Sequence, residues 1–173
     1  MTDLQRCQDF WQARRSVILS TQDQAGLIET SVTPFISDEQ GCLYVFISEL
    51  AQHTQNLLNL MASRAEKTDQ IFQAGGVSAL LVADESETEQ LYARERITLK
   101  LDATEITRGS VEYDQLIAKF EAEFGEVIGL LNSLPDFHLI QLKPISGGYV
   151  IGFGKAFTFD GFLSDGLTPI SKK

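Results

Sequence analysis

The chain has 173 residues, with 14 lysines and arginines against 24 aspartates and glutamates, so its formal net charge is −10. Hydrophobic residues make up 43% of it and charged residues 22%, which is typical of a globular protein rather than a disordered or fibrous one. The acidity argues against a broad nucleic-acid-binding surface, because neutralising phosphates requires clustered lysine and arginine. We therefore expect one domain over residues 1–173 and no nucleic-acid partner; a small-molecule substrate remains compatible with this composition.

Cysteine and histidine are scarce. Cys7 and Cys42 are too few for a disulfide framework and match no zinc motif, so we expect two reduced thiols and a cytoplasmic location. His53 and His138 lie far apart and in no metal-ligand spacing, so we expect no metal site. The N-terminus lacks an apolar signal core, and no apolar run reaches the ~18–20 residues that span a bilayer. Membrane association is therefore not expected.

The first part of the chain predicts a short helix followed by an antiparallel meander. Residues 3–13 place apolar side chains on one stripe at helical spacing. β-rich segments follow at residues 16–20, 28–36 and 42–47, with turn-forming residues between them. Because short turns join strands that are adjacent in sequence, these three segments should pair antiparallel.

Ser48 is well suited to cap a helix that continues through Leu58. A helix start exposes free N–H groups and the positive end of the helix dipole, both of which attract phosphate. Ser48, Gln52 and His53 are therefore candidate phosphate contacts. The alternative is a plain serine cap with an exposed first turn. A polar, helix-prone stretch at residues 65–73 comes next.

The second half alternates between strands and helices. We expect a buried strand at 77–83, an exposed acidic loop at 84–89 and a half-exposed strand at 94–106. A helix capped by Ser110 and stopped by Gly125 should follow, with a further helical turn before Pro135. The last predicted strands are at 137–142 and 149–159, and a turn at 143–148 joins them. Six or seven strands with short connections favour a mostly antiparallel sheet. Such a sheet must protect its edges, so we expect a small barrel with helices outside it.

Two pairs of residues have both a functional and a structural interpretation. Arg94 and Arg96 share a face of their strand, where they could grip an anion or could be solvated and paired with the acidic loop. Gly152 and Gly154 weaken a strand unless the backbone bends or something packs against it. This pattern predicts either a β-bulge at a barrel corner or contact with a ligand or a second subunit.

Four segments carry a family resemblance, and together they extend over about residues 8–160. They are SVTPF at 31–35, SELAQHTQNL at 48–57, ARERITL at 93–99, and the stretch from FHLIQLKP to GGYVIGFGKA at 137–156. In this order they resemble the FMN-binding split-barrel proteins related to pyridoxamine 5′-phosphate oxidase. Within that family the chain is most similar to the haem-utilisation branch.

The resemblance implies a β-rich α+β fold: a six-stranded, mostly antiparallel split β-barrel with peripheral helices, an N-terminal helix at 1–14 and a tail at 160–173. It implies a homodimer with FMN at the subunit interface. Ser31, Val32, Thr33 and Pro34 would line the flavin ring. The other implied cofactor contacts are Ser48, Gln52 and His53 near the phosphate, Arg94 and Arg96 beside the flavin, and Phe153 and Lys155 near the dimer cleft.

The predicted function is that of an FMN-binding oxidoreductase, with catalytic residues that the sequence does not name. A haem-binding or haem-degrading protein of haem iron utilisation is the alternative. The chain departs from the oxidase because residues 29–35 and 52–53 lack arginine and lysine. It departs from the haem-degrading members because its tail lacks the histidine that serves them as an iron ligand. His53 or His138 could substitute for that ligand. A further alternative is a non-catalytic dimer that has lost its cofactor.

Overall fold

The computed structural model describes residues 1–65 and 76–170. Its helices are α1 (Asp3–Gln12), α2 (Gln52–Ala65), α3 (Val111–Phe124) and α4 (Val127–Asn132), with short 3-10 turns η1 (Glu85–Glu87), η2 (Leu91–Ala93) and η3 (Leu163–Asp165). Its strands are β1 (Ser16–Gln22), β2 (Ile28–Pro34), β3 (Ile36–Ser37), β4 (Leu43–Ser48), β5 (Val77–Val82), β6 (Arg96–Glu105), β7 (Phe137–Gly152), β8 (Lys155–Asp160) and β9 (Thr168–Pro169). This order confirms a strand-rich α+β fold.

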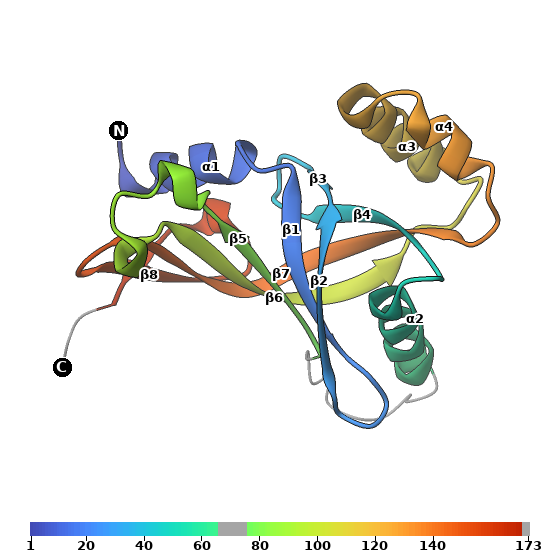
Figure 1. Ribbon diagram of the computed structural model, residues 1–173, viewed down its shortest axis with the longest axis horizontal. Coiled ribbons are helices and arrows are strands. Elements are labelled where there is room, and N and C mark those ends of the chain that lie inside the picture. Colours follow the sequence, from blue (N-terminus) through green and yellow to red (C-terminus); the bar gives the residue numbers. More distant parts are fainter. Residues whose placement is uncertain (66–75, 171–173) are drawn as a thin grey trace.

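The strands form one curled antiparallel sheet in the order β2-β1-β5-β6-β7-β4-β3, with β8 paired to β7 and β9 to β8 (Figure 1). The described residues therefore contain nine strands rather than the six of the prediction. The long strand β7 accounts for part of the difference. Along one edge it pairs first with β4 and then with β8, while β6 runs along its other edge.

The sheet separates two apolar cores. The larger core is formed by inward-facing residues of β1, β5, β6 and β7, and α1 covers it with Cys7, Phe10 and Trp11. The smaller core lies between β4 and the α3–α4 hairpin, where Phe46 packs against Phe120 at a ring-centroid distance of 6.1 Å. Figure 1 shows this hairpin projecting from one end of the sheet, with α2 placed separately from it. None of the described helices is long and apolar enough to cross a bilayer.

Local capping signals predicted one helix well. The Ser110 hydroxyl accepts a hydrogen bond from the Tyr113 N–H at 3.1 Å, and α3 ends at Gly125, whose φ is +85°. The prediction for Ser48 was wrong, because α2 begins four residues later at Gln52 and Ser48 is the last residue of β4. The Ser48 hydroxyl accepts from the Leu50 N–H at 3.1 Å and thus closes a turn before the helix.

The predicted break at residues 143–148 is also wrong, because β7 is one continuous strand. Pro144 lies beside the register shift between Lys100 and Leu101, where β7 contains the extra residue Ile145 and therefore bulges without ending. The chain turns later, at Phe153 and Gly154, and Gly154 has φ +71°. A register shift between Val150 and Gly152 precedes this turn, so the bulge interpretation of the glycines describes the local structure. Apart from Ala65, the helix-prone stretch at 65–73 lies outside the described residues.

Candidate functional site

A polar cluster lies between α2 and the β1–β2 hairpin. The five polar side chains buried in the described part of the chain all belong to these elements: Thr21, Thr33, His53, Thr54 and Asn56. Asn56 donates to the Thr21 hydroxyl at 3.0 Å and accepts from the Gln52 amide at 2.9 Å. Buried polar groups are costly unless they are paired, so their concentration at one place marks a candidate site.

His53 is a residue of this cluster whose ring has an unpaired nitrogen. Its Nδ1 is 2.8 Å from the Ser31 hydroxyl, while its Nε2 is buried and has no hydrogen-bond partner. Burial lowers the pKa of His53, and the nearby charge of Glu29 only partly opposes this. His53 is thus a neutral imidazole, and its unpaired nitrogen can accept a hydrogen bond or bind a metal ion.

Strand β2 divides the other predicted flavin contacts between two faces. Ser31 and Thr33 point toward α2, and the Thr33 side chain is 3% exposed. Val32 and Pro34 alternate with them, and Val32 is 66% exposed. The four residues of this motif therefore do not line one surface within a single chain.

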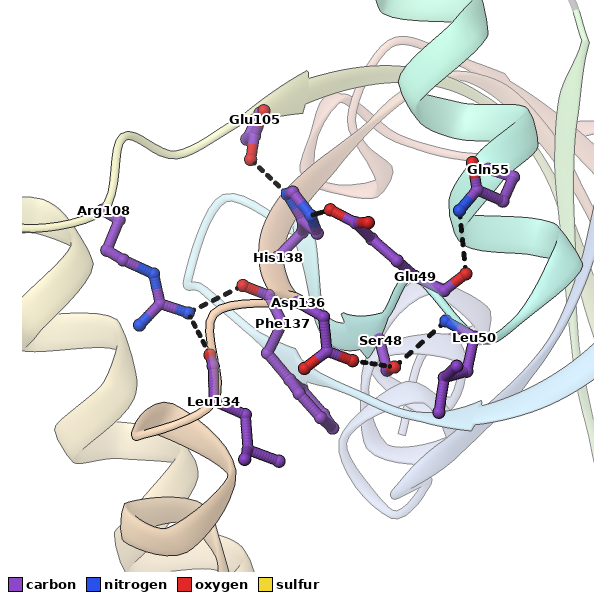
Figure 2. Close-up of polar contacts among 10 residues, drawn as sticks. All are labelled: Ser48, Glu49, Leu50, Gln55, Glu105, Arg108, Leu134, Asp136, Phe137 and His138. Atoms are coloured by element: carbon purple, nitrogen blue, oxygen red, sulfur yellow. Dashed lines mark hydrogen bonds and ion pairs between the residues drawn. The ribbon is translucent and has the colours of Figure 1, made fainter.

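Ser48 lies in an acidic environment rather than beside a cation (Figure 2). Its hydroxyl donates to the Asp136 carboxylate at 2.6 Å, and Glu49 follows it in the chain. Gln52 turns inward to Asn56. Two carboxylates near the approach to α2 oppose phosphate binding there.

His138 lies close to the same turn, and both of its nitrogens are occupied. Nε2 is 2.7 Å from the Glu49 carboxylate and Nδ1 is 2.6 Å from that of Glu105, as Figure 2 shows. Burial alone would lower the pKa of His138, but the hydrogen bonds and charges of Glu105 and Glu49 outweigh it, so the pKa lies above its ordinary value. Because carboxylates occupy both of its nitrogens, this histidine is not a free ligand.

The two arginines at the start of β6 both form hydrogen bonds within the chain. Arg94 precedes the strand; its Nε donates to the Ala83 carbonyl at 2.6 Å and its Nη1 pairs with Glu85 at 3.1 Å. This matches the structural interpretation, in which the arginine pairs with the acidic loop. Arg96 begins β6 and donates to the Arg94 carbonyl at 2.9 Å. The hairpin residues Phe153 and Lys155 lie elsewhere: Phe153 is 73% exposed, and Lys155 is 3.9 Å from Asp3.

One sheet face forms a site that the sequence reading missed. Register places a row of side chains on it from six strands: Thr30, Ser20, Ser78, Lys100, Ser146 and Asp160. Two adjoining grooves of about 550 and 510 Å³ lie along this face and share Ser20, Ser78 and Lys100. We call it the open face. The alternation of β6 placed Lys100 on a polar face, but only the strand order brings the serines beside it.

No protein-family model matches the chain, but individual proteins do. It is 36% identical over 153 residues to the haem oxygenase HutZ of Vibrio cholerae, covering 88% of this chain and 78% of that protein. The chain belongs to the HutZ family. The crystal structure of HutZ, described as a haem storage protein, superposes with a TM-score of 0.68 at 34% identity, covering 83% of this chain and 91% of the other.

More distant structures agree on the fold. Campylobacter jejuni ChuZ superposes with a TM-score of 0.78 at 26% identity, covering 96% of this chain and 61% of its own. A pyridoxamine 5′-phosphate oxidase homologue from Listeria innocua gives a TM-score of 0.56 at 11% identity, covering 84% and 96%, and shows the fold alone. The predicted family is therefore confirmed: this HutZ-family chain has the split-barrel fold of the oxidase and belongs to its haem-utilisation branch.

The similarity to HutZ overturns the main functional prediction. An FMN-dependent oxidoreductase was expected, whereas the 36% identical relative is named a haem oxygenase. The side chains offer a physical reason: Ser48 is bound to Asp136, and Arg94 is paired with Glu85. The predicted phosphate contact Ser48 is thus bonded to a carboxylate, and Arg94, which was predicted beside the flavin, is already paired.

Proposed function

We propose that this chain binds haem and degrades it in haem iron utilisation. The observation that carries the proposal is the 36% identity to the haem oxygenase HutZ over 88% of the chain. Haem is the substrate here, and its iron supplies the redox chemistry. The protein's part is to bind the macrocycle, orient it and exclude water.

His53 is the residue that would hold the haem iron. Of the two histidines, it alone keeps a nitrogen without a partner, and haem iron is commonly held by a neutral imidazole. Nε2 is covered by the surrounding chain, so ligation requires the ring to turn outward. One hydrogen bond, to the Ser31 hydroxyl, opposes that turn.

We propose further that the protein is a homodimer with its site at the subunit interface. The open face supports this, because its residues Ser78, Thr98 and Lys100 are exposed in the single chain. Gly148 leaves this face without a side chain at its position, and a Cβ there would lie 3.2 Å from the Thr98 hydroxyl. Lys100 and Arg96 lie on the same face of β6 and supply two cations to the open face, where they could pair with the carboxylates of a ligand. Phe153 and Lys155 remain proposed cleft residues.

A single domain over residues 1–173 and a cytoplasmic location complete the proposal. Cys7 and Cys42 are free and buried, as expected of reduced thiols. Burial raises the pKa of Cys7 to about 12 and that of Cys42 to about 11. Neither thiol is therefore a reactive thiolate at neutral pH.

A haem titration followed by absorption spectroscopy tests the proposal. The purified protein should develop a Soret band, and His53→Ala should shift that band and weaken binding about tenfold or more, because the axial ligand is lost. His138→Gln is the matched control and should keep the position of the band. Bound haem exposed to oxygen and a reductant should then lose its Soret absorbance.

Each outcome separates one part of the proposal. Absence of a Soret band in the unaltered protein would overturn haem binding and favour the cofactor-free dimer. A band that neither His53→Ala nor His138→Ala changes would rule out a histidine ligand. A Soret band that stays constant with oxygen and reductant would leave haem binding and remove degradation.

A further inference from the structure

The His138 imidazole joins two parts of the chain that are distant in sequence. Its Nε2 contacts the Glu49 carboxylate at 2.7 Å and its Nδ1 contacts that of Glu105 at 2.6 Å (Figure 2). The His138 side chain is 17% exposed, and the two glutamates are roughly half exposed. A protonated ring donates from both nitrogens, whereas a neutral ring donates from only one. The protonation state thus decides whether both links exist.

Both glutamates belong to segments that direct a helix. Glu49 lies in the turn between β4 and α2; its N–H donates to the Asp136 carbonyl at 2.9 Å, and its carbonyl accepts from the Gln55 amide of α2 at 2.8 Å. Glu105 is the last residue of β6, and the chain continues from it toward α3. The imidazole therefore ties the entry of one helix to the approach of another.

The charges around His138 leave it as the cation of the cluster. Glu49 and Glu105 face it directly, and Asp136 is occupied by the Ser48 hydroxyl. Arg108 is nearby on the α3 side, but it donates to backbone carbonyls, among them that of Phe137 at 2.8 Å. Within the described part of the chain, Glu49 and Glu105 form no ion pair with any other cation.

We propose that His138 is a pH-sensitive clamp that holds the turn before α2 to the end of β6. The two carboxylate partners raise the pKa of the ring above the ordinary histidine value of 6.5, so the clamp is complete while the ring is protonated and both glutamates are ionised. It is lost as pH rises through the raised pKa, because the neutral ring can donate to only one glutamate. Loss of either contact breaks the link between the turn at 49–51 and the end of β6.

The geometry favours a clamp over a metal site. Glu49 and Glu105 contact opposite nitrogens of the ring, so their carboxylates diverge rather than converge on one point. Among the described residues, no group of three histidine, cysteine or acidic side chains could hold a metal ion. The two ion pairs instead bridge separations of 89 and 33 residues along the chain.

The clamp has a consequence for the proposed haem site, and that consequence rests on the proposed function. Helix α2 carries His53 in its first turn, directly after the segment that Glu49 anchors. Loosening this segment should ease the outward turn of the His53 ring. Haem association would then become faster as pH rises through the His138 titration.

The clamp itself is tested on the haem-free protein. Amide hydrogen exchange of residues 49–55, corrected for the intrinsic effect of pH, should accelerate about fivefold between pH 6 and pH 9, because partly exposed ion pairs of this kind are weak. His138→Gln should remove this pH dependence. Glu105→Gln should lower the His138 titration midpoint measured by NMR, and Glu123→Gln, which removes the surface partner of Arg15, is the matched control.

An unchanged exchange profile in His138→Gln would overturn the clamp. If that variant does not fold, an unshifted His138 midpoint in both Glu105→Gln and Glu49→Gln would overturn it equally. Because these measurements use no haem, they can succeed where the haem titration fails, and the reverse also holds. A pH-dependent haem association rate that survives in His138→Gln would remove only the coupling to α2.

Discussion

At the scale of single residues, Glu95 is bonded to two side chains from other parts of the described chain. Its carboxylate accepts from Arg6 Nε at 3.1 Å and Nη2 at 2.8 Å, and from the Tyr149 hydroxyl. Burial would raise the pKa of Glu95, but its bonds to Arg6 and Tyr149 outweigh this and lower it. These bonds tie α1 to the residue directly before β6 and to the C-terminal part of β7.

Glu95→Gln should therefore destabilise the protein by about 1–2 kcal/mol, a range reduced by the 43% exposure of Arg6. A lowered carboxyl pKa gives stability that is present above the unfolded-state pKa and is lost as pH falls through the folded one. The deficit of the variant, measured by denaturant unfolding, should thus be largest above about pH 5 and shrink in acid. Glu123→Gln should cost under about 0.5 kcal/mol, and an equal cost in both variants would contradict this account.

At the scale of elements, β7 depends on close packing at one glycine. Gly147 lies between Leu99 of β6 and Phe159 of β8 in the sheet, facing the larger core. A Cβ at this position would come within 2.2 Å of Phe159 Cζ. Phe159 is only 3% exposed, so its ring is packed and must shift to admit that Cβ.

Gly147→Ala should accordingly destabilise the protein by about 1–3 kcal/mol through overpacking. Gly152→Ala is the matched control in the same strand, because a Cβ there meets no atom within 4 Å. Thermal unfolding of both variants checks the difference. Equal midpoints would show that the ring moves aside at no cost.

At the scale of the whole molecule, the open face is a broad sheet surface whose side chains are largely exposed among the described residues. A second row across it runs from apolar to small polar side chains: Val32, Ile18, Leu80, Thr98, Gly148 and Thr158. Exposed apolar area next to small residues is typical of a surface that packs against another chain. Isologous pairing would place the same rows of two copies against each other.

If the open face is the dimer interface, Thr98→Arg should convert a dimer into a monomer, because it places a long cation at the centre of the second row. Light scattering coupled to size exclusion gives the mass directly. Gln115→Arg, on the exposed side of α3, should leave the dimer intact. A dimeric Thr98→Arg would move the interface elsewhere, and a monomeric unaltered protein would overturn the proposed homodimer.

Predictions from the sequence succeeded where the deciding contacts are local. Ser110 caps the start of α3 and Gly125 caps its end, each through a partner within four residues. The residue types alone therefore indicated both helix ends. Ser48 has the same residue type as Ser110, but its hydroxyl is bound to Asp136, which is 88 residues away. No local pattern could show that partner.

The same reasoning explains the error in β7. The residues at 143–148 carry proline and glycine, which are ordinary turn signals, but the strand continues because β6 pairs along its length. The half-exposed strand predicted at 94–106 was likewise correct, but the serine neighbours of Lys100 come from β5 and β7. Register between distant strands decided both features.

The sequence by itself determined the class of this protein: an acidic, strand-rich chain with the motifs of the haem-utilisation split barrels, only two histidines and no histidine in its tail. Only the tertiary structure distinguished those histidines. His53 is neutral with a free buried nitrogen, whereas His138 is charged between two carboxylates. The physical reason is that protonation and ligand capacity depend on burial and on nearby charge, which the fold assembles from residues far apart in the chain.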